Sequence, residues 1–341
     1  MTKPVQPEKL TAKDFASDQE VRWCPGCGDY AILKCLQRTL PELDATPENT
    51  VFVSGIGCSS RFPYYMATYG FHTIHGRAPA VATGLKLANP DLDIWVVTGD
   101  GDGLSIGGNH MLHMLRRNVD LNILLFNNEI YGLTKGQYSP TSQPGTRSPS
   151  TPFGSIERPV SPCSFALGSG GRFVARTIDT DQKHMPEVFR RAKDHKGASF
   201  VEIFQNCIVF NDAVFADFTN RDVAAERQLN AHHGEPLLFG KEKDKGLSLN
   251  RDKLALEVIK IGENGHTLDD VLVHDETNPI LAQMLTNIHP PDFPMVLGVL
   301  FCDPAESFET AITGQIKAIS RKKPDASLEK MMHSGRTWEV K

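Results

Sequence analysis

Residues 92–103, LDIWVVTGDGDG, contain the pattern that decides the fold of this chain. The first seven are mostly apolar or β-branched, which is typical of a strand buried on both faces, and alternating glycine and aspartate follow. Residues 121–128, LNILLFNN, repeat this pattern with a strand that ends at two asparagines. We expect a helix over residues 105–117 between the two strands. This order predicts neighbouring parallel strands whose polar ends meet at one edge of a sheet.

Segments on either side extend the pattern to a whole domain. Further buried strands are predicted over 50–56, 173–178 and 199–204, with a late strand inside VLGVLFCDP at 296–304. Apolar residues at helical spacing predict helices over 29–40, 78–88 and 185–195. The predicted fold class is therefore α/β, with a parallel sheet covered by helices on both faces. Ligands bind such sheets beyond the carboxyl ends of the strands.

Composition and charge limit what kind of protein this is. Of the 341 residues, 40% are hydrophobic, which is enough to form a folded core. The formal net charge is −5, so nucleic-acid binding has no electrostatic support. The polar first residues do not resemble a signal peptide, and no run of eighteen apolar residues occurs. We therefore expect a cytoplasmic protein that binds neither nucleic acid nor a membrane.

Three regions are expected along the chain. Residues 1–20 are polar and form an N-terminal arm, whose order would need a partner surface. Residues 21–215 form the ligand-binding domain, which includes a long loop at 134–164 rich in Pro, Ser and Thr. Residues 216–341 are more polar and less regular, and we expect them to be a C-terminal extension at a subunit interface.

The seven cysteines indicate metal or redox chemistry, because an odd number that includes a CxxC motif is not typical of a secreted disulfide framework. Cys24 and Cys27 lie in WCPGCG, Cys58 lies in GIGCSSR, and Cys207 ends a strand in FVEIFQNC. Four thiolates at one sheet edge would suit either a [4Fe–4S] cluster or a tetrahedral zinc ion. A thioredoxin-like dithiol is disfavoured, because no strand precedes the motif. The cysteines expected to be structural are Cys35, Cys163 and Cys302.

A second candidate site follows the two strands of the opening pattern. Asp100 and Asn128 are 28 residues apart, about one helix plus one strand, so both should reach the same sheet edge. The Asp100 carboxylate, the Asn128 side-chain carbonyl and the Ile130 backbone carbonyl are oxygen ligands that suit Mg²⁺ bound with a diphosphate. The alternative is a glycine-rich turn in which Asp100 only caps a helix.

Two further observations concern the ligand. No G-x-G-x-x-G motif opens a helix in this chain, so a nicotinamide site is not expected. His75, Gly76 and Arg77 directly precede the helix at 78–88. A histidine and an arginine there suit a diphosphate or carboxylate, although a surface salt bridge is the alternative.

Five motifs in this order resemble the β subunits of 2-oxoacid:ferredoxin oxidoreductases, and the 2-oxoglutarate members most of all. They are WCPGCG (23–28), GIGCSSR (55–61), HTIHGRA (72–78), GDG (99–101) and NNEIYGLTKGQYSPTS (127–142). The GDG followed by two asparagines resembles the thiamine diphosphate signature. The resemblance covers roughly residues 20–215.

The resemblance implies the pyrophosphate-binding fold of thiamine enzymes, with thiamine diphosphate, Mg²⁺ and one [4Fe–4S] cluster held by residues 21–215. The implied cluster ligands are Cys24, Cys27, Cys58 and Cys207, and the implied Mg²⁺ ligands are Asp100, Asn128 and the backbone oxygen of Ile130. The implied cofactor-binding residues also include Ile56, Gly57, Ser59, His75, Gly76, Arg77, Gly99, Gly101, Asp102, Tyr131, Gly132, Leu133 and Thr134.

The resemblance also implies a reaction and its partners. A 2-oxoacid, expected to be 2-oxoglutarate, would be oxidised with coenzyme A to an acyl-CoA and CO₂, reversibly, while ferredoxin is reduced. In this family the α subunit supplies the glutamate that activates thiamine, so an α₂β₂ complex is implied. The alternatives are a pyruvate- or branched-chain-specific member, a thiamine-dependent decarboxylase without redox function, and a zinc-stabilised assembly subunit.

Overall fold

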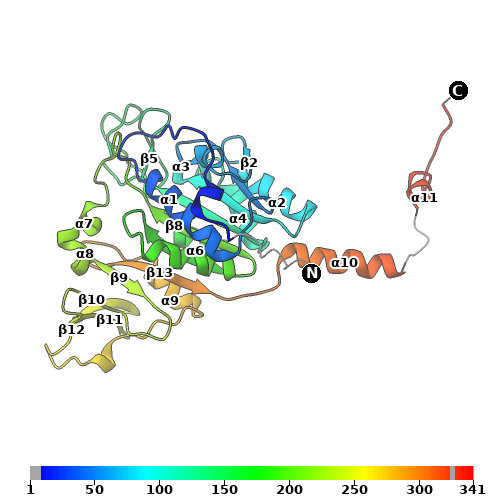
Figure 1. The fold of residues 1–341 in the computed structure, drawn as a ribbon. Helices are drawn as coiled ribbons and strands as arrows, with labels where there is room; N and C mark the ends of the chain where they lie inside the picture. The colour runs from blue at the N-terminus through cyan, green and yellow to red at the C-terminus, as the bar shows by residue number, and fades with distance from the viewer. Residues whose placement is uncertain (1–8, 323–326, 341) are drawn as a thin grey trace, which may run out of the picture.

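One large sheet organises the chain in the computed structural model, which describes residues 9–322 and 327–340 (Figure 1). Eight strands lie in the order β2-β1-β3-β4-β8-β7-β13-β9. Their bounds are β1 (Thr50–Ser54), β2 (Tyr69–His72), β3 (Asp93–Gly99), β4 (Leu121–Asn127), β7 (Phe173–Ile178), β8 (Ala198–Phe204), β9 (Gln228–Ala231) and β13 (Met295–Cys302). Neighbours are parallel, except that β13 is antiparallel to β7. The six strands predicted from sequence are all confirmed.

Helices cover both faces of this sheet, which confirms the predicted α/β class. One face packs against α2 (Ala78–Ala88), α4 (Gly108–Arg116), α5 (Pro162–Gly168) and α9 (Pro279–Leu285). The other face packs against α1 (Asp29–Thr39) and α6 (His184–Asp194). Strand residues alternate between these two cores, as the period of two requires: Ile94 of β3 faces the first core and Trp95 the second.

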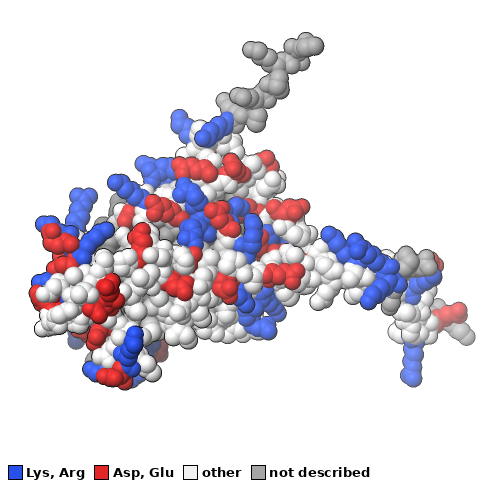
Figure 2. Space-filling model, turned by 90° about the horizontal axis from the view of Figure 1, so that it is seen from below, with Lys and Arg blue, Asp and Glu red and all other residues white. Residues whose placement is uncertain are grey.

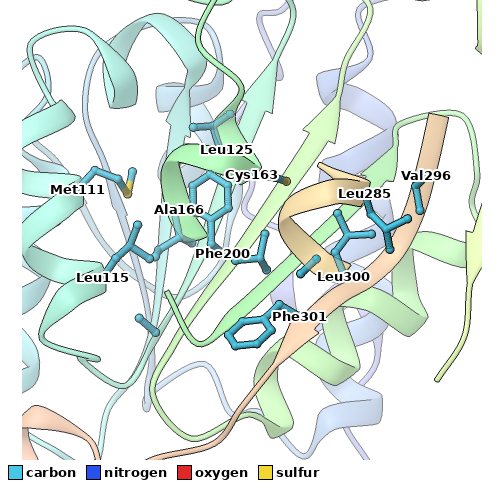
Figure 3. Close-up of a cluster of buried hydrophobic side chains, with 14 of the residues drawn as sticks. Met111, Leu115, Leu125, Cys163, Ala166, Phe200, Leu285, Val296, Leu300 and Phe301 are labelled. Atoms are coloured by element: carbon cyan, nitrogen blue, oxygen red, sulfur yellow. The ribbon is translucent and has the colours of Figure 1, made fainter. Parts of the chain in front are cut away.

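The first core shows how distant segments meet around the sheet. Figure 3 shows Met111 and Leu115 of α4 beside Phe200 of β8, with Leu285 of α9 next to Leu300 of β13. All five side chains are buried. This packing holds β13 beside the rest of the sheet although about 90 residues separate it from β8.

The helix expected over 105–117 is α4, which begins at Gly108, three residues later than expected. A separate short helix that was not predicted, α3 (Asp100–Leu104), begins directly at the GDGD motif. The turn between them brings Gly107 against α3, where an added Cβ would lie 2.4 Å from the backbone oxygen of Asp102. Only glycine permits that approach, and the turn therefore separates the two helices.

Residues 12–15 of the expected N-terminal arm pack against the folded domain. Of the expected arm, residues 1–8 lie outside the described residues. In the short helix η1 (Ala12–Phe15), Phe15 is completely buried in the core that α1 forms with the sheet. The backbone N–H of Ala67 donates to the carbonyl of Phe15 at 2.9 Å. The Phe15 side chain therefore anchors residues 12–15 to this core.

The region after residue 215 contributes to the main sheet through β9 and β13, so the sheet extends beyond the expected boundary. A separate three-stranded sheet lies within the same region. Its strands are β10 (Leu238–Phe239), β11 (Lys245–Asn250) and β12 (Ala255–Lys260). The remaining elements of the chain are η2 (Leu40–Leu43), η3 (Ser59–Tyr65), β5 (Ile130–Tyr131), β6 (Gln137–Tyr138), α7 (Ala216–Thr219), α8 (Arg221–Arg227), η4 (Leu268–Asp270), α10 (Phe308–Lys322) and α11 (Leu328–Met332).

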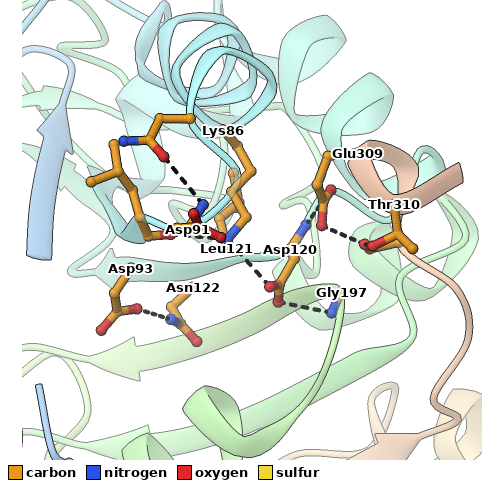
Figure 4. Close-up of polar contacts among 12 residues, drawn as sticks. Lys86, Asp91, Asp93, Asp120, Leu121, Asn122, Gly197, Glu309 and Thr310 are labelled. Atoms are coloured by element: carbon orange, nitrogen blue, oxygen red, sulfur yellow. Dashed lines mark hydrogen bonds and ion pairs between the residues drawn. The ribbon is translucent and has the colours of Figure 1, made fainter. Parts of the chain in front are cut away.

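Helix α10 projects away from the body of the protein, with only its first turn attached (Figure 1). Figure 4 shows this attachment, where Glu309 accepts a hydrogen bond from the backbone N–H of Asp120. Asp120 also binds Lys86 at 3.3 Å and the backbone N–H of Gly197 at 3.1 Å, at the sheet edge where β4 and β8 begin. Basic side chains gather toward the far end of α10, while charges of both signs cover the body in that view (Figure 2).

Within the part of the chain that the structure describes, no helix is long and apolar enough to cross a bilayer. Residues 323–326 and 341 of the expected C-terminal extension lie outside the described residues.

Candidate functional site

The carboxyl ends of β1, β3 and β4 border a cavity of about 400 Å³. Parallel neighbours bring these ends to one edge, which is where ligands of such sheets bind. The predicted residues that line this cavity are Ile56, Gly57, Cys58, Ser59, His75, Gly99, Asp100, Gly101, Asp102, Asn128, Ile130, Tyr131, Gly132, Leu133 and Thr134. The structure thus brings together in one place residues from four separate segments.

Asp100 is the first residue of α3 and faces this cavity while only 2% exposed. The hydroxyls of Ser139 and Thr141 both donate to its Oδ2 at 2.6 Å. Burial raises the pKa of Asp100 above its usual range, so the charged carboxylate is costly unless a cation stands beside it. With Asn128 and Ile130 on the same cavity, the donor set is entirely oxygen, and this suits Mg²⁺.

Asp102 has a different function from Asp100, although both lie in the same short helix. Its Oδ1 accepts hydrogen bonds from the backbone N–H groups of Ile56 at 3.1 Å and Gly76 at 2.7 Å, and contacts Nδ1 of His75 at 2.6 Å. Its Oδ2 accepts from the Thr98 hydroxyl at 2.8 Å. Asp102 therefore fastens the loop after β1 and the loop before α2 to the same point.

Two predicted residues do not line the cavity. Gly76 lies at its rim and contributes only the backbone N–H that Asp102 accepts. Arg77 is exposed at the start of α2, and its guanidinium contacts His110 of α4. Its side chain points to a neighbouring helix because the backbone before α2 directs His75, not Arg77, to the sheet edge.

Sequence reasoning missed four residues of this site. Phe126 and Gln137 line the cavity, and Ser139 with Thr141 binds Asp100. The signal for the last two was present: hydroxyl residues cluster in YSPTS, directly after the asparagine motif, where a buried carboxylate needs donors.

The four predicted cluster cysteines line a second cavity of about 170 Å³. Cys24 and Cys27 come from the turn before α1, Cys58 from the end of β1, and Cys207 from the loop after β8. The backbone N–H of Gly28 donates to the carbonyl of Asn206 at 3.2 Å, which ties the first segment to the last. Burial raises the pKa of Cys58 to about 12 and that of Cys27 further. These thiolates therefore need a positively charged group beside them.

Four thiols around one cavity are the donor set of an iron–sulfur cluster, and a tetrahedral zinc ion takes the same ligands. Within residues 9–322 and 327–340, no group of three His, Cys, Asp or Glu side chains is arranged to hold a single metal ion.

The remaining cysteines lie elsewhere. Cys35 and Cys163 are completely buried in the two cores, and Cys302 contacts His195 at 3.8 Å between sulfur and Nδ1. None of these three lines either cavity. The two cavities adjoin, because Cys58, Asn128, Gly132 and Leu133 line both.

Comparison with known proteins shows the family to which this chain belongs. A family model described as thiamine pyrophosphate enzyme, C-terminal TPP binding domain, matches residues 55–203. The chain is 49% identical over 340 residues to 2-oxoglutarate oxidoreductase subunit KorB of Mycobacterium tuberculosis, covering 98% of this chain and 89% of that one. The chain belongs to the 2-oxoacid oxidoreductase β subunits. All residues that line the 400 Å³ cavity lie within the matched segment 55–203.

Two further relatives of this β subunit agree with that placement. It is 46% identical over 196 residues to 2-oxoacid:ferredoxin oxidoreductase 1, subunit beta, of Aeropyrum pernix, covering 58% of this chain and 62% of the relative. Its fold matches a solved structure of 2-oxoglutarate:ferredoxin oxidoreductase from Magnetococcus marinus with 2-oxoglutarate, coenzyme A and succinyl-CoA bound. That match has a TM-score of 0.75 and 32% identity, and covers 97% of both chains.

Proposed function

We propose that this chain is the β subunit of a 2-oxoglutarate:ferredoxin oxidoreductase that holds thiamine diphosphate, Mg²⁺ and one [4Fe–4S] cluster. The observation that carries the proposal is the contact between the two cavities. Cys58 lines both, so an electron acceptor bound by the thiols would lie directly beside a cofactor bound at the strand ends. A decarboxylase without redox function has no need of that neighbour.

The positions of the site residues relative to the segment matched by the family model support both cofactors. The segment matched by the thiamine pyrophosphate family model, 55–203, contains Asp100 and Asn128, but Cys24, Cys27 and Cys207 lie outside it. The diphosphate site thus belongs to the part shared by thiamine enzymes, whereas three of the four thiols flank that part. This division favours a redox member of the family.

Each group of residues would perform a defined task. When bound, thiamine diphosphate would supply an electron sink for decarboxylation of a 2-oxoacid, and the cluster would supply one-electron redox chemistry. Asp100, Asn128 and the Ile130 carbonyl would hold Mg²⁺ against the diphosphate. Asp102 fixes His75 at the cavity, with its Nδ1 engaged and its other ring nitrogen free of that contact. The cavity walls would exclude water from the reacting carbon.

An α subunit would complete the site. Thiamine activation needs a glutamate, and among the described residues no glutamate lines the 400 Å³ cavity. The β-subunit name of the relatives supports an α subunit as donor of that group, in an α₂β₂ complex. Ferredoxin would be the electron acceptor outside the complex. Free thiols are typical of reducing compartments, and they support a cytoplasmic location.

The substrate proposal is 2-oxoglutarate with coenzyme A. It rests on the name of the Mycobacterium tuberculosis relative and on the molecules in the Magnetococcus marinus structure. A pyruvate- or branched-chain-specific member is the alternative, supported by the broader 2-oxoacid name of the Aeropyrum pernix relative.

The test is to purify the chain anaerobically with its α subunit and measure viologen reduction with 2-oxoglutarate, pyruvate and a branched-chain 2-oxoacid. We expect coenzyme A-dependent reduction that is fastest with 2-oxoglutarate, and visible absorbance that dithionite bleaches. A colourless complex with stoichiometric zinc would contradict the cluster, and decarboxylation without viologen reduction would contradict the redox function. Faster viologen reduction with another 2-oxoacid would contradict only the assignment of 2-oxoglutarate as substrate.

A further inference from the structure

Gln205 lies between the two cofactor cavities. It is the first residue after β8, as Asn128 is the first residue after β4. The last paired positions of these parallel strands are Asn127 and Phe204, so the register places Asn128 and Gln205 side by side. The backbone N–H of Gln205 donates to the Asn127 carbonyl at 2.8 Å and continues the pairing.

The side chain of Gln205 contacts a predicted ligand of each cofactor site. Its Oε1 accepts a hydrogen bond from Nδ2 of Asn128 at 2.7 Å. Its Nε2 donates to the sulfur of Cys27 at 3.4 Å and to the Asn206 carbonyl. With 1% exposure, the amide is held by these contacts and cannot exchange them for water.

We propose that Gln205 is a positioning residue that joins the metal site of the diphosphate to the iron–sulfur site. The inference rests on the proposed function. The Oε1 contact engages the Asn128 amide nitrogen. This leaves Oδ1, which accepts the backbone N–H of Ile130 at 3.2 Å and has a second lone pair, as the Asn128 atom that can face Mg²⁺. The Nε2 contact places an N–H on one cluster sulfur. One neutral side chain thereby sets the ligand geometry of one site and the electronic environment of the other.

Each contact has a separate physical consequence. An N–H···S hydrogen bond stabilises negative charge on the sulfur, which favours the reduced cluster and raises its reduction potential. Loss of the Gln205 contact leaves only the Ile130 N–H to orient the Asn128 amide, and loss of such an outer partner typically costs 10–100-fold in metal affinity. Because both contacts come from one buried amide, a substitution can remove one or both.

Two substitutions separate these effects in the anaerobically purified αβ complex. Gln205→Met keeps the side-chain length but removes both contacts. Gln205→Glu keeps an oxygen for Asn128 and replaces the donor to Cys27. Gln37→Met is the matched control, since Gln37 is a partly buried glutamine of α1 whose Nε2 donates to the Tyr65 carbonyl, away from both cavities. The readouts are the cluster midpoint potential by redox titration and the Mg²⁺-dependent Kd of thiamine diphosphate.

Gln205→Met should lower the midpoint potential of the cluster by about 59 mV, which is a tenfold weaker affinity for one electron. The same variant should raise the Mg²⁺-dependent Kd of thiamine diphosphate about tenfold. Gln205→Glu should lower the potential while the Kd stays within about threefold, and Gln37→Met should change neither quantity. An unchanged potential or an unchanged Kd in Gln205→Met overturns the inference, as does an equal loss of affinity in both Gln205 variants. If Gln205→Met loses its iron, Gln205→Glu decides alone: a lowered potential supports the inference and an unchanged one overturns it.

The same measurements distinguish this inference from the function on which it rests. A wild-type complex without a reducible cluster, or without Mg²⁺-dependent thiamine diphosphate binding, contradicts the proposed function. A wild-type complex with both properties, together with unaffected Gln205 variants, contradicts only the inference.

Discussion

Asp100 and Asp102 are two residues apart in α3, yet their substitution should produce opposite effects. Asp102 accepts the partly buried backbone N–H of Ile56 and the buried backbone N–H of Gly76, and it also contacts His75 and Thr98. Asp102→Ala would leave both N–H groups unpaired, at a cost of about 1–3 kcal/mol each. We therefore expect a loss of about 4 kcal/mol in stability, since the two loops also lose a common anchor.

Asp100→Asn should leave the protein without ligands nearly as stable as the wild type. An amide oxygen at this position still accepts the hydroxyls of Ser139 and Thr141, and the costly buried charge is removed. We expect a change within about 1 kcal/mol. The loss of the negatively charged ligand should, however, weaken Mg²⁺-dependent binding of thiamine diphosphate by at least about 100-fold.

Thermal unfolding of the ligand-free complex and titration of thiamine diphosphate at fixed Mg²⁺ separate the two effects. Asp102→Ala should lower the Tm by roughly 10 °C, and Asp100→Asn should lower it by no more than roughly 3 °C. The division of tasks is refuted if Asp102→Ala melts like the wild type. It is equally refuted if Asp100→Asn is destabilised but still binds the cofactor with Mg²⁺ dependence.

Three further changes test other parts of the structure. Cys24→Ala should lose iron and its visible absorbance while thiamine diphosphate binding stays measurable; retained iron would contradict the ligand assignment. Phe15→Ala should cost about 3–5 kcal/mol, seen in denaturant unfolding, because Phe15 is completely buried; an unchanged midpoint would mean that this segment adds no stability. Burial lowers the pKa of His195 from 6.5 to about 4. Between pH 6.5 and pH 4 the unfolded chain therefore binds a proton at His195 that the folded chain does not, and the free energy of unfolding falls as the pH drops through this range. His195→Gln should remove up to about 3 kcal/mol of this dependence, and an identical pH profile would exclude His195 as its source.

The strands that form the site could be predicted because buried parallel strands are continuous apolar runs. β3 and β4 end at Gly99 and Asn127, where polar residues begin, so chain order alone places Asp100 and Asn128 at one edge. The 400 Å³ cavity at the strand ends is accordingly lined by most of the residues that the motifs indicated.

Edge strands and long-range contacts could not be predicted in this way. All four residues of β2 are exposed and one of them is a glycine, so that strand lacks the continuous apolar run of a buried strand. Backbone pairing with β1 defines it. The contacts of Gln205 reach 77 residues back to Asn128 and 178 residues back to Cys27. Such partners become neighbours only through the strand register, which a local pattern does not contain.

Two glycines lie beside the thiols at the boundary between the two cavities. An ideal Cβ on Gly132 would lie 3.5 Å from the sulfurs of both Cys58 and Cys207, so the Gly132 backbone lies close to two of the thiols. At Gly57, with φ of +131°, an added Cβ would meet no protein atom within 4 Å, although that backbone conformation is costly for other residues. Gly57 is therefore favoured by its backbone conformation, whereas Gly132 keeps side-chain atoms out of the space beside the two sulfurs. In the function proposed above, electrons would cross this boundary, and the absence of side chains at both positions keeps the separation between the two cavities short.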